Sequence, residues 1–494
     1  MSGFVVKPAI ANRLLNWMLF LGGLMAVQSS PAAVAAKPIL VHYMPWFVAK
    51  PYSDSWGWHW TMTHFNPDAT NSLGQRLIAS KYYPLIGPYD SADPVVLEYH
   101  VALMKLGGVD GVIADWYGQD NHLDYGTINQ RTLALLNYTR KAGLKFSLCY
   151  EDRTVQQEVN DGYISSSNAV AHAQLTMLYA QTNYFLSTNY LVWNAKPVLL
   201  NFGPQYFSLN SQWQQIFSVL TNPPAFFTED NRLPIGSGAF NWPPMWMSQT
   251  NNGVVALSAL ESYLSNFQQT GASWPTYISS AFPRFNDIYQ QAGLGFTYGT
   301  LADNDGETFR STLSRALTNN CSSAQIVTWN DHGEGTVVEP TVEFGYRDLG
   351  IIQDLRRQYV DANFGRHTND LTLATRLYNL RRKHAGNGLA NAELDRVFAN
   401  IISGDLISAR VQMDGMEAGL PVLYKIALNN GVLSFSIGGG ISTAVREVQI
   451  ATNLAAPDWV TINSFSASVN EAVFSTAVSN QVTQTFFRVR TQGQ

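Results

Sequence analysis

The sequence is poor in charged side chains and in cysteine. Asp, Glu, Lys and Arg make up 14% of its 494 residues, against about a quarter in an average globular protein. So low a charge content, together with many aromatic residues, argues against a nucleic-acid-binding protein, which needs basic patches to contact phosphates, while the net charge of -5 gives no strong signal. The length still allows a large core and more than one domain.

Only two cysteines occur, and their placement argues against a disulfide. Cys149 lies near the end of one expected strand, and Cys321 lies just before the start of another. In a parallel sheet these positions are at opposite ends of strands of about 17–20 Å, whereas a disulfide needs Cα atoms within about 7 Å. We expect two free, buried thiols.

Metal-binding motifs are also missing. The 9 histidines include no H-x-x-x-H or H-E-x-x-H pair. The segment DNDG at 303–306 resembles the start of a calcium loop, but Thr312 stands where such a loop has its Glu. We interpret this segment as a turn and expect no metal and no cofactor.

Aromatic residues, in contrast, are abundant. They form 12% of the chain, with 13 Trp and 23 Tyr. An aromatic ring covers the apolar face of a sugar ring, so this composition suits a carbohydrate ligand, although large cores use aromatic residues too.

The N-terminus has the pattern of a secretory signal peptide over residues 1–36. Lys7 and Arg13 precede an apolar run at 14–27, and small residues follow at 32–36. A run of about fourteen residues is too short to span a bilayer comfortably. We therefore expect a secreted or periplasmic protein that has no membrane segment after cleavage.

The next part of the chain predicts an α/β fold. Eight apolar runs alternate with helical patterns, at 38–47, 111–117, 145–151, 197–202, 225–230, 235–240, 276–282 and 325–331. Helices are expected at 93–106, 127–142 and 307–318. Eight such units predict a (β/α)₈ TIM barrel over 37–365; a doubly wound open sheet is the alternative, weakened because no Gly-rich phosphate loop follows the first strand.

Two smaller parts follow the barrel. Residues 366–415 read as a helical segment with charged faces, and residues 416–494 alternate as in a small β-sandwich-like domain. An attachment or structural role suits this last domain better than sugar binding, because Trp459 is its only tryptophan.

Polar and aromatic residues gather where the expected strands end, which is where a barrel of this kind places its active site. These candidates for substrate binding are Tyr43, Trp46, Asp115, Trp116, Tyr117, Glu151 and Asn201, with His42, Tyr150, Asp152 and Arg153 beside them.

The segment WNDHGEGTVVEP at 329–340 holds the strongest candidates for catalysis. Cleavage of a glycosidic bond needs two carboxyl groups, and Asp331 and Glu334 offer them. Residues three apart in a strand point to opposite faces, so the two acids share a site only if the chain turns at Gly333 and Gly335. His332 is a ligand, a proton carrier or a pocket hydrogen-bonder, or it points away. Glu339 and Glu343 are weaker candidates, expected at the start of the next helix.

This segment resembles the strand-eight motif of glycoside hydrolase family 99, the endo-α-mannosidases and endo-α-mannanases. It is also similar to the Trp-Asn-Asp-Tyr-Gly-Glu motif of family 71, the α-1,3-glucanases. YPLIGPYDS at 83–91 and MKLGGVDGVI at 104–113, which runs on into Asp115-Trp116-Tyr117-Gly118, resemble family 99. Trp58-His59-Trp60 is similar to that family's sugar-pocket cluster, and Glu151 to its strand-end Glu. The resemblance covers about residues 38–354.

The resemblance implies roles for individual residues. Glu334 matches the general acid and Asp331 the position of the base, with Trp329, Asn330 and His332 beside them as substrate contacts. Family 99 has Glu where this chain has Asp331, which puts the family's 1,2-anhydro route in doubt and leaves retention or inversion open. The resemblance implies an exported endo-acting hydrolase of an α-linked glycan, with α-mannan favoured over α-1,3-glucan. A non-catalytic glycan-binding barrel is the other alternative.

Overall fold

The computed structural model describes residues 37–492, apart from 440–443, 467, 469 and 478–484. The expected signal peptide lies outside the described residues. Among those residues no helix is long and apolar enough to cross a membrane.

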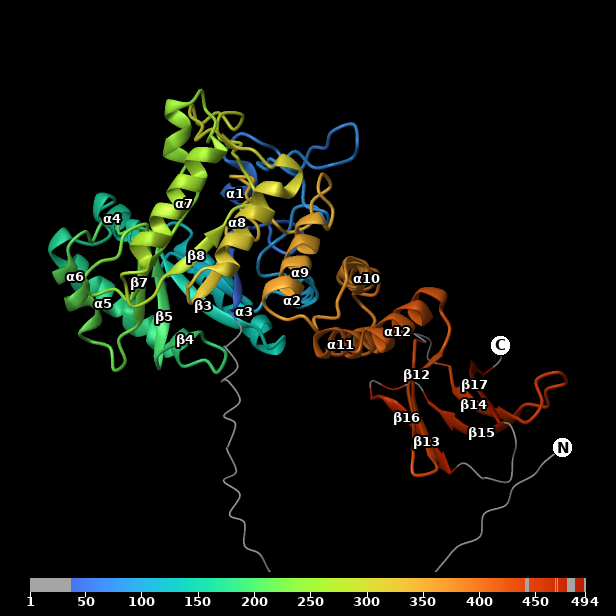
Figure 1. The fold of residues 1–494 in the computed structure, drawn as a ribbon. Coiled ribbons are helices and arrows are strands. Elements are labelled where there is room, and N and C mark those ends of the chain that lie inside the picture. The colour runs from blue at the N-terminus through green and yellow to red at the C-terminus, as the bar shows by residue number, and fades with distance from the viewer. Residues whose placement is uncertain (1–36, 440–443, 467, 469, 478–484, 493–494) are drawn as a thin grey trace, which may run out of the picture. The chain divides into compact units, whose positions relative to one another are not determined.

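Eight parallel strands close into a barrel, as the sequence predicts (Figure 1). The closing pair is β3–β5, and β4 (Val192–Trp193) adds antiparallel to β5 outside the ring. The barrel strands are β1 (Ile39–Tyr43), β2 (Gly111–Trp116), β3 (Lys145–Tyr150), β5 (Lys196–Asn201), β6 (Ala225–Glu229), β7 (Gly238–Phe240), β8 (Ile278–Ala281) and β11 (Ser323–Ile326). The last strand ends at Ile326 and not at Asp331, so the WNDHGEG segment belongs to the loop that follows.

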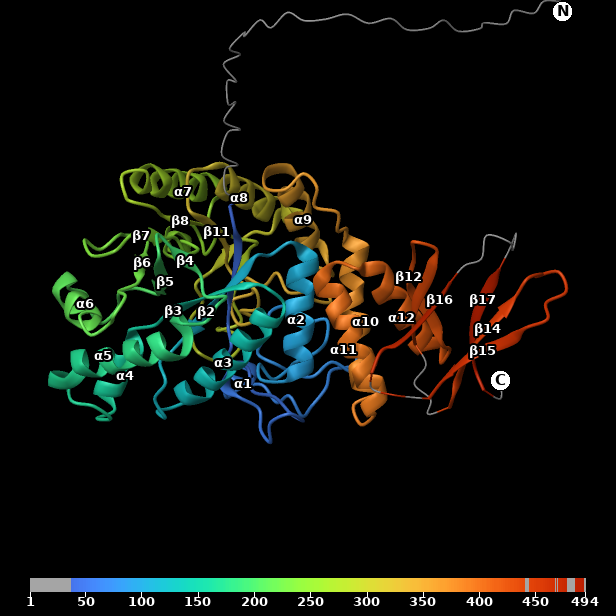
Figure 2. The ribbon, with the colours of Figure 1, turned by 90° about the horizontal axis from the view of Figure 1, so that it is seen from below.

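Helices surround the strands (Figure 2). Their bounds are α1 (Trp58–Thr61), α2 (Pro94–Gly107), α3 (Tyr125–Lys141), α4 (Arg153–Asn160), α5 (Ala169–Ala180), α6 (Asn210–Phe217), α7 (Leu257–Gly271), α8 (Glu307–Thr318) and α9 (Arg347–Tyr359). The ends of α2 follow from its sequence. The Asp93 side chain accepts from the Val95 N–H, Pro94 has no N–H that would need an acceptor in the first turn, and Gly108 takes a left-handed φ of 85°.

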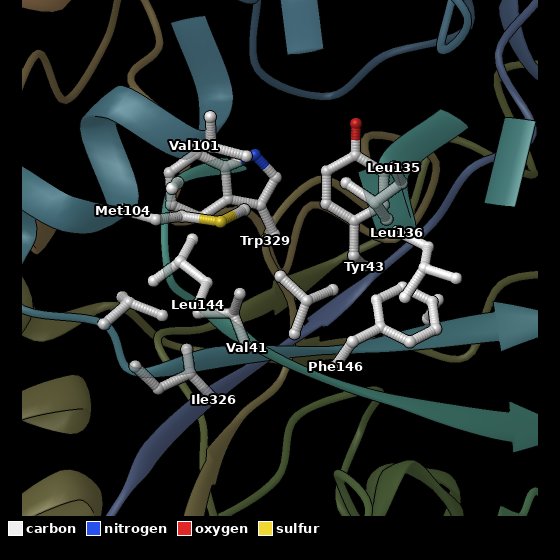
Figure 3. Close-up of a cluster of buried hydrophobic side chains, with 14 of the residues drawn as sticks. Val41, Tyr43, Val101, Met104, Leu135, Leu136, Leu144, Phe146, Ile326 and Trp329 are labelled. Atoms are coloured by element: carbon white, nitrogen blue, oxygen red, sulfur yellow. The ribbon is translucent and has the colours of Figure 1, made fainter. Parts of the chain in front are cut away.

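Side chains of the strands alternate between two apolar cores. Val41, Phe146 and Ile326 point outward and pack with Leu135, Leu136 and Leu144, beneath the helices (Figure 3). Leu40, Ile113, Leu200 and Phe227 point inward and fill the barrel. Both layers are buried, which is why these strands read as continuous apolar runs. Cys149 and Cys321 are free and buried, as expected.

Three helices follow the barrel: α10 (Thr368–Lys383), α11 (Gly388–Ser403) and α12 (Leu406–Ala418). Arg381 of α10 reaches α2, where its Nε and Nη2 donate to the two carboxylate oxygens of Glu98 at 2.9 and 2.8 Å. Such a bidentate pair fixes both distance and orientation.

The C-terminal part has two antiparallel sheets of three strands. One has the order β12 (Val422–Asn429), β13 (Val432–Gly438), β16 (Ala472–Ala477), and the other β15 (Val460–Phe465), β14 (Arg446–Ala451), β17 (Phe486–Thr491). Phe435 and Phe474 of one sheet lie against Phe487 of the other, with ring centroids 6.0 and 6.4 Å from it. The two sheets thus share one apolar core, as in a sandwich. Domain boundaries at 365 and 415 stay a prediction.

Candidate active site

The chain turns between Asp331 and Glu334. The Glu334 N–H donates to Asp331 Oδ1 at 3.0 Å, and the Gly335 N–H donates to the Asp331 carbonyl at 3.0 Å. Gly335 has a φ of 66°, and a Cβ at this position would lie 2.7 Å from the Asn286 carbonyl oxygen. Glycine is therefore required here both for backbone conformation and for space.

This turn is held by several neighbours. The Thr328 N–H donates to the Thr336 carbonyl at 3.0 Å, the two hydroxyls lie 2.9 Å apart, and Thr328 Oγ1 accepts from the Asp331 N–H at 2.8 Å. The Arg284 guanidinium donates to the Val337 carbonyl at 2.7 Å. These bonds restrain the carboxylates through their own backbone.

The two carboxyls differ in their affinity for a proton. Burial raises the pKa of Asp331 to about 6, and the backbone N–H groups of Glu334 and Gly333 oppose that rise. Burial raises the pKa of Glu334 too, and the negative charge of Asp331 raises it further. The proton therefore resides on Glu334 while Asp331 ionises first. One acid and one base then stand side by side near neutral pH.

Two predicted acids from neighbouring strands face the same site. Burial and the charges of Glu151 and Asp331 raise the pKa of Asp115. Burial raises the pKa of Glu151 to about 7, and Asp331 contributes to this rise. The charge of Asp331 thus raises the pKa of one carboxyl on β2 and of another just after β3, which places the acids of β2, β3 and the loop after β11 in one site.

A further acid, Glu229 at the end of β6, was missed by the sequence reasoning. Burial raises its pKa to about 8, with contributions from Asp230 and Glu151. The alternation of side chains along the strand could have identified it. Ala225 and Phe227 point into the barrel, and Glu229, two residues further on, is expected to point the same way.

Aromatic side chains form one wall of the site. Trp46 stacks on His59, with centroids 4.2 Å apart and planes 5° apart, and it lies 6.3 Å from Tyr117. Trp58 meets His59 edge-on at 5.1 Å and is 45% exposed. Burial lowers the pKa of His59 to about 3. The wall is therefore neutral and partly open, as a sugar face requires.

Six other predicted contacts lie away from solvent. Tyr43, Trp60, Trp116, Asn201, Trp329 and Asn330 are each 0% exposed. Figure 3 shows Tyr43 and Trp329 among the side chains of the outer core. None of the six offers an exposed surface to a ligand in this structure.

Five of these side chains have hydrogen-bond partners within the protein, whereas the buried indole N–H of Trp329 has none among the described residues. Tyr43 Oη lies 2.9 Å from His100 Nδ1, and the indole N–H of Trp116 donates to Asn129 at 3.0 Å. The Trp60 indole donates to the Tyr89 carbonyl at 2.7 Å. The amide of Asn201 donates to Asp152 at 3.2 Å, and that of Asn330 bonds both the N–H and the carbonyl of Met44. They support the strand ends from behind.

Glu339 is not at a helix start, as the sequence suggested, because α9 begins only at Arg347. It is buried between two imidazoles. His100 Nε2 lies 3.1 Å from one oxygen, and His332 Nε2 and the Tyr89 hydroxyl lie 3.4 and 2.6 Å from the other. These contacts turn His332 toward Glu339. Burial alone would raise the pKa of Glu339. The charge of His100 and hydrogen bonds from both imidazoles outweigh burial and hold this pKa at about 2.

This depressed pKa predicts a pH-dependent contribution to stability. The contribution is fully present above the unfolded pKa of 4.5 and is lost as the pH falls toward 2. Glu339→Gln should therefore lower the free energy of unfolding at pH 7 by about 3 kcal/mol, and the gap to wild type should shrink to roughly half by pH 3. Urea unfolding at several pH values measures this gap.

The exposed Glu343 supplies the matched control. Glu343→Gln should stay within about 1 kcal/mol of wild type at every pH. A gap for Glu339→Gln that is independent of pH would contradict the ionised state of Glu339.

Within the described part of the chain, two groups of side chains could hold a cation by proximity. One, His42, Asp115 and Cys149, lies inside the barrel, and the other comprises Asp120, Glu158 and His172. In the 303–306 segment, Asp303 instead accepts from Arg284 at 2.8 Å and from Arg347 at 2.6 Å. The segment is therefore an ion-paired turn.

Comparisons with known proteins point to one group. The sequence is 35% identical over 99 residues to the glycoprotein endo-alpha-1,2-mannosidase-like protein of Danio rerio and 26% identical over 128 residues to the glycoprotein endo-alpha-1,2-mannosidase of Mus musculus. The matches cover 18% and 24% of this chain, but only 22% and 28% of the two relatives. No family model matches the sequence.

Among solved structures, the GH99 endo-alpha-mannosidase from Bacteroides thetaiotaomicron is similar at 17% identity, with a TM-score of 0.47 over 65% of this chain and 97% of that chain. The predicted resemblance to family 99 is thus confirmed by the two curated relatives.

Proposed function

We propose that this chain is an exported endo-acting glycoside hydrolase that cleaves an α-linked, mannan-like glycan. The observation that carries the proposal is the turn at Gly333–Gly335, which holds Asp331 and Glu334 in one buried site with unequal proton affinities. A hydrolase needs such a pair, because one group must protonate the leaving oxygen while the other is ionised. The names of the curated relatives supply the substrate class.

In this mechanism Glu334 is the general acid. It gives its proton to the glycosidic oxygen as the bond to the anomeric carbon breaks. Asp331 is the base, and it removes a proton either from the sugar's 2-hydroxyl or from an attacking water. The wall of Trp46, His59 and Tyr117 would cover the apolar face of the sugar.

The additional carboxyls Asp115, Glu151 and Glu229 favour a substrate rich in hydroxyl groups. Each carboxylate accepts hydrogen bonds from hydroxyls when ionised and donates one when protonated. Their raised pKa values, about 7 for Glu151 and about 8 for Glu229, allow both roles near neutral pH. Export of the chain is proposed from its N-terminal sequence pattern.

The test is an activity screen of the full chain on α-mannan and α-1,3-glucan, with β-1,4-mannan as the control for linkage. We expect hydrolysis of α-mannan with release of oligosaccharides from within the chain. Proton NMR of the first-formed product decides between retention and inversion. Binding to α-mannan without release of any reducing ends would overturn the proposal in favour of a glycan-binding protein.

A further inference from the structure

A group of three potential ligands lies apart from the acid pair. Asp120 belongs to the loop after β2, Glu158 to α4 and His172 to α5. His172 Nε2 lies 2.9 Å from an oxygen of Asp120 and 3.0 Å from an oxygen of Glu158. All three ligand atoms lie within 4.8 Å of one another. Three separate segments therefore meet at one imidazole nitrogen.

Hydrogen bonding within the protein does not account for this arrangement. One ring nitrogen carries at most one proton, and that proton points along one direction. Glu158 Oε2, the oxygen 3.0 Å from His172 Nε2, is buried with its side chain only 3% exposed, and it makes no hydrogen bond to any described residue despite this ionic contact. A buried carboxylate oxygen without a donor costs free energy unless something else neutralises it.

The distances suit a metal ion. Bonds of about 2.0–2.1 Å from a metal to nitrogen and oxygen place ligand atoms about 3.0 Å apart in an octahedral site and about 3.3 Å apart in a tetrahedral one. The observed separations of 2.9 and 3.0 Å between the His172 nitrogen and the two carboxylate oxygens are close to these ligand–ligand distances. Asp120 and His172 retain side-chain exposures of 20% and 13%, so water can reach the group and complete the coordination.

We propose that Asp120, Glu158 and His172 bind a divalent transition-metal cation, with Zn²⁺ as the best match to one imidazole and two carboxylates. Zn²⁺ accepts nitrogen and oxygen ligands together, whereas Ca²⁺ and Mg²⁺ prefer oxygen alone. The cation would neutralise both carboxylates and give Glu158 Oε2 a direct bond in place of its contact with His172, which forms no hydrogen bond.

The position implies a structural role. The loop after β2 begins at Tyr117, which lies beside Trp46 in the aromatic wall, and it ends at Asp124, which lies 3.8 Å from His59. The cation would fasten this loop to α4 and α5 and so keep one side of the site in place. It would take no part in the proton transfers of Asp331 and Glu334.

The test is Zn²⁺ binding by the full chain without a histidine tag, after treatment with a chelator. Isothermal titration calorimetry with Zn²⁺ should give about one equivalent, and Zn²⁺ should raise Tm by mass action. Asp120→Asn and Glu158→Gln should each weaken Zn²⁺ binding more than about tenfold and abolish the rise in Tm. An anomalous signal at the zinc edge in crystals should lie among the three side chains.

A neighbouring pair provides the matched control. His122 belongs to the same loop as Asp120 but lies outside the group, and its Nε2 is 2.8 Å from an oxygen of Asp161, which directly follows α4. His122→Gln should therefore leave Zn²⁺ binding unchanged. Asp120→Asn is partly exposed and keeps the shape of the side chain, so its fold is expected to survive, and circular dichroism checks this. No binding below millimolar Zn²⁺, or binding unchanged in both ligand variants, would overturn the proposal.

Discussion

Glu334→Gln should lower kcat/KM on α-mannan by about 10²–10⁴-fold, because an amide cannot protonate the leaving oxygen. Asp331→Asn should cause a loss of similar size, because the base is then absent. Initial rates of reducing-sugar release by the purified variants measure both effects. Each substitution is nearly isosteric, so unchanged thermal unfolding would show that the loss comes from chemistry.

The two variants should differ on an activated substrate. The fluoride ion of a glycosyl fluoride leaves without being protonated. Glu334→Gln should therefore recover most of its activity on an α-mannosyl fluoride, while Asp331→Asn should not. This contrast separates the acid from the base, which a simple loss of activity cannot do.

Glu307 serves as the control for removing a carboxylate. It lies on α8 with 72% of its side chain exposed, and Glu307→Gln should keep wild-type kinetics. Equal rescue of both site variants by the fluoride, or full activity of either on α-mannan, would contradict the assigned roles.

Arg284→Met should destabilise the barrel by about 3–5 kcal/mol, because it removes the buried one of the two guanidinium groups that Asp303 and Asp348 share and leaves Arg347 alone to balance both carboxylates. The Arg284 side chain is 1% exposed and donates to Asp303 at 2.8 Å, to Asp348, and to the Val337 carbonyl at 2.7 Å. It also lies over the Phe344 ring, 4.0 Å from the centroid. Urea unfolding followed by fluorescence gives the shift in midpoint.

Two companions make this measurement specific. Asp348→Asn in the Arg284→Met background should recover part of the lost stability, because it leaves one carboxylate, Asp303, for the one remaining guanidinium of Arg347. Arg310→Met is the matched control, because Arg310 is 39% exposed and its ion pairs are loose, with 3.7 Å to each acidic partner. This substitution should lower the free energy of unfolding by less than about 1 kcal/mol. A loss below about 1 kcal/mol for Arg284→Met would show that the buried pairs contribute no net stability.

Arg284 also connects stability with activity. Its bond to the Val337 carbonyl holds the loop that carries Asp331 and Glu334. We therefore expect Arg284→Met to lower kcat even at temperatures where the barrel remains folded.

The barrel and the turn between Asp331 and Glu334 could both be predicted from the sequence. Eight apolar runs such as 111–117 and 145–151 identify buried parallel strands, because both faces of such strands must be apolar. The glycines at 333 and 335 were sufficient to predict a turn between two acids, since this conformation is local to a few residues.

Which side chains face the site could not be predicted from the sequence, because it depends on how each strand end is oriented in the fold. Trp116 follows Asp115 directly in the sequence, yet it packs outward against Tyr150 at 5.7 Å while Asp115 faces Glu151. The end of β11 was misplaced by five residues, because Thr328 is β-branched like a strand residue but pairs with Thr336 in the loop.

The tertiary structure also decided the charges of these groups. Glu334 and Glu339 lie five residues apart in one motif, yet burial beside Asp331 raises the pKa of one and the imidazoles of His100 and His332 lower that of the other. His100 is 239 residues from Glu339 in the chain. A pKa depends on the charges and the solvent around a group, and these come from segments that only folding brings together.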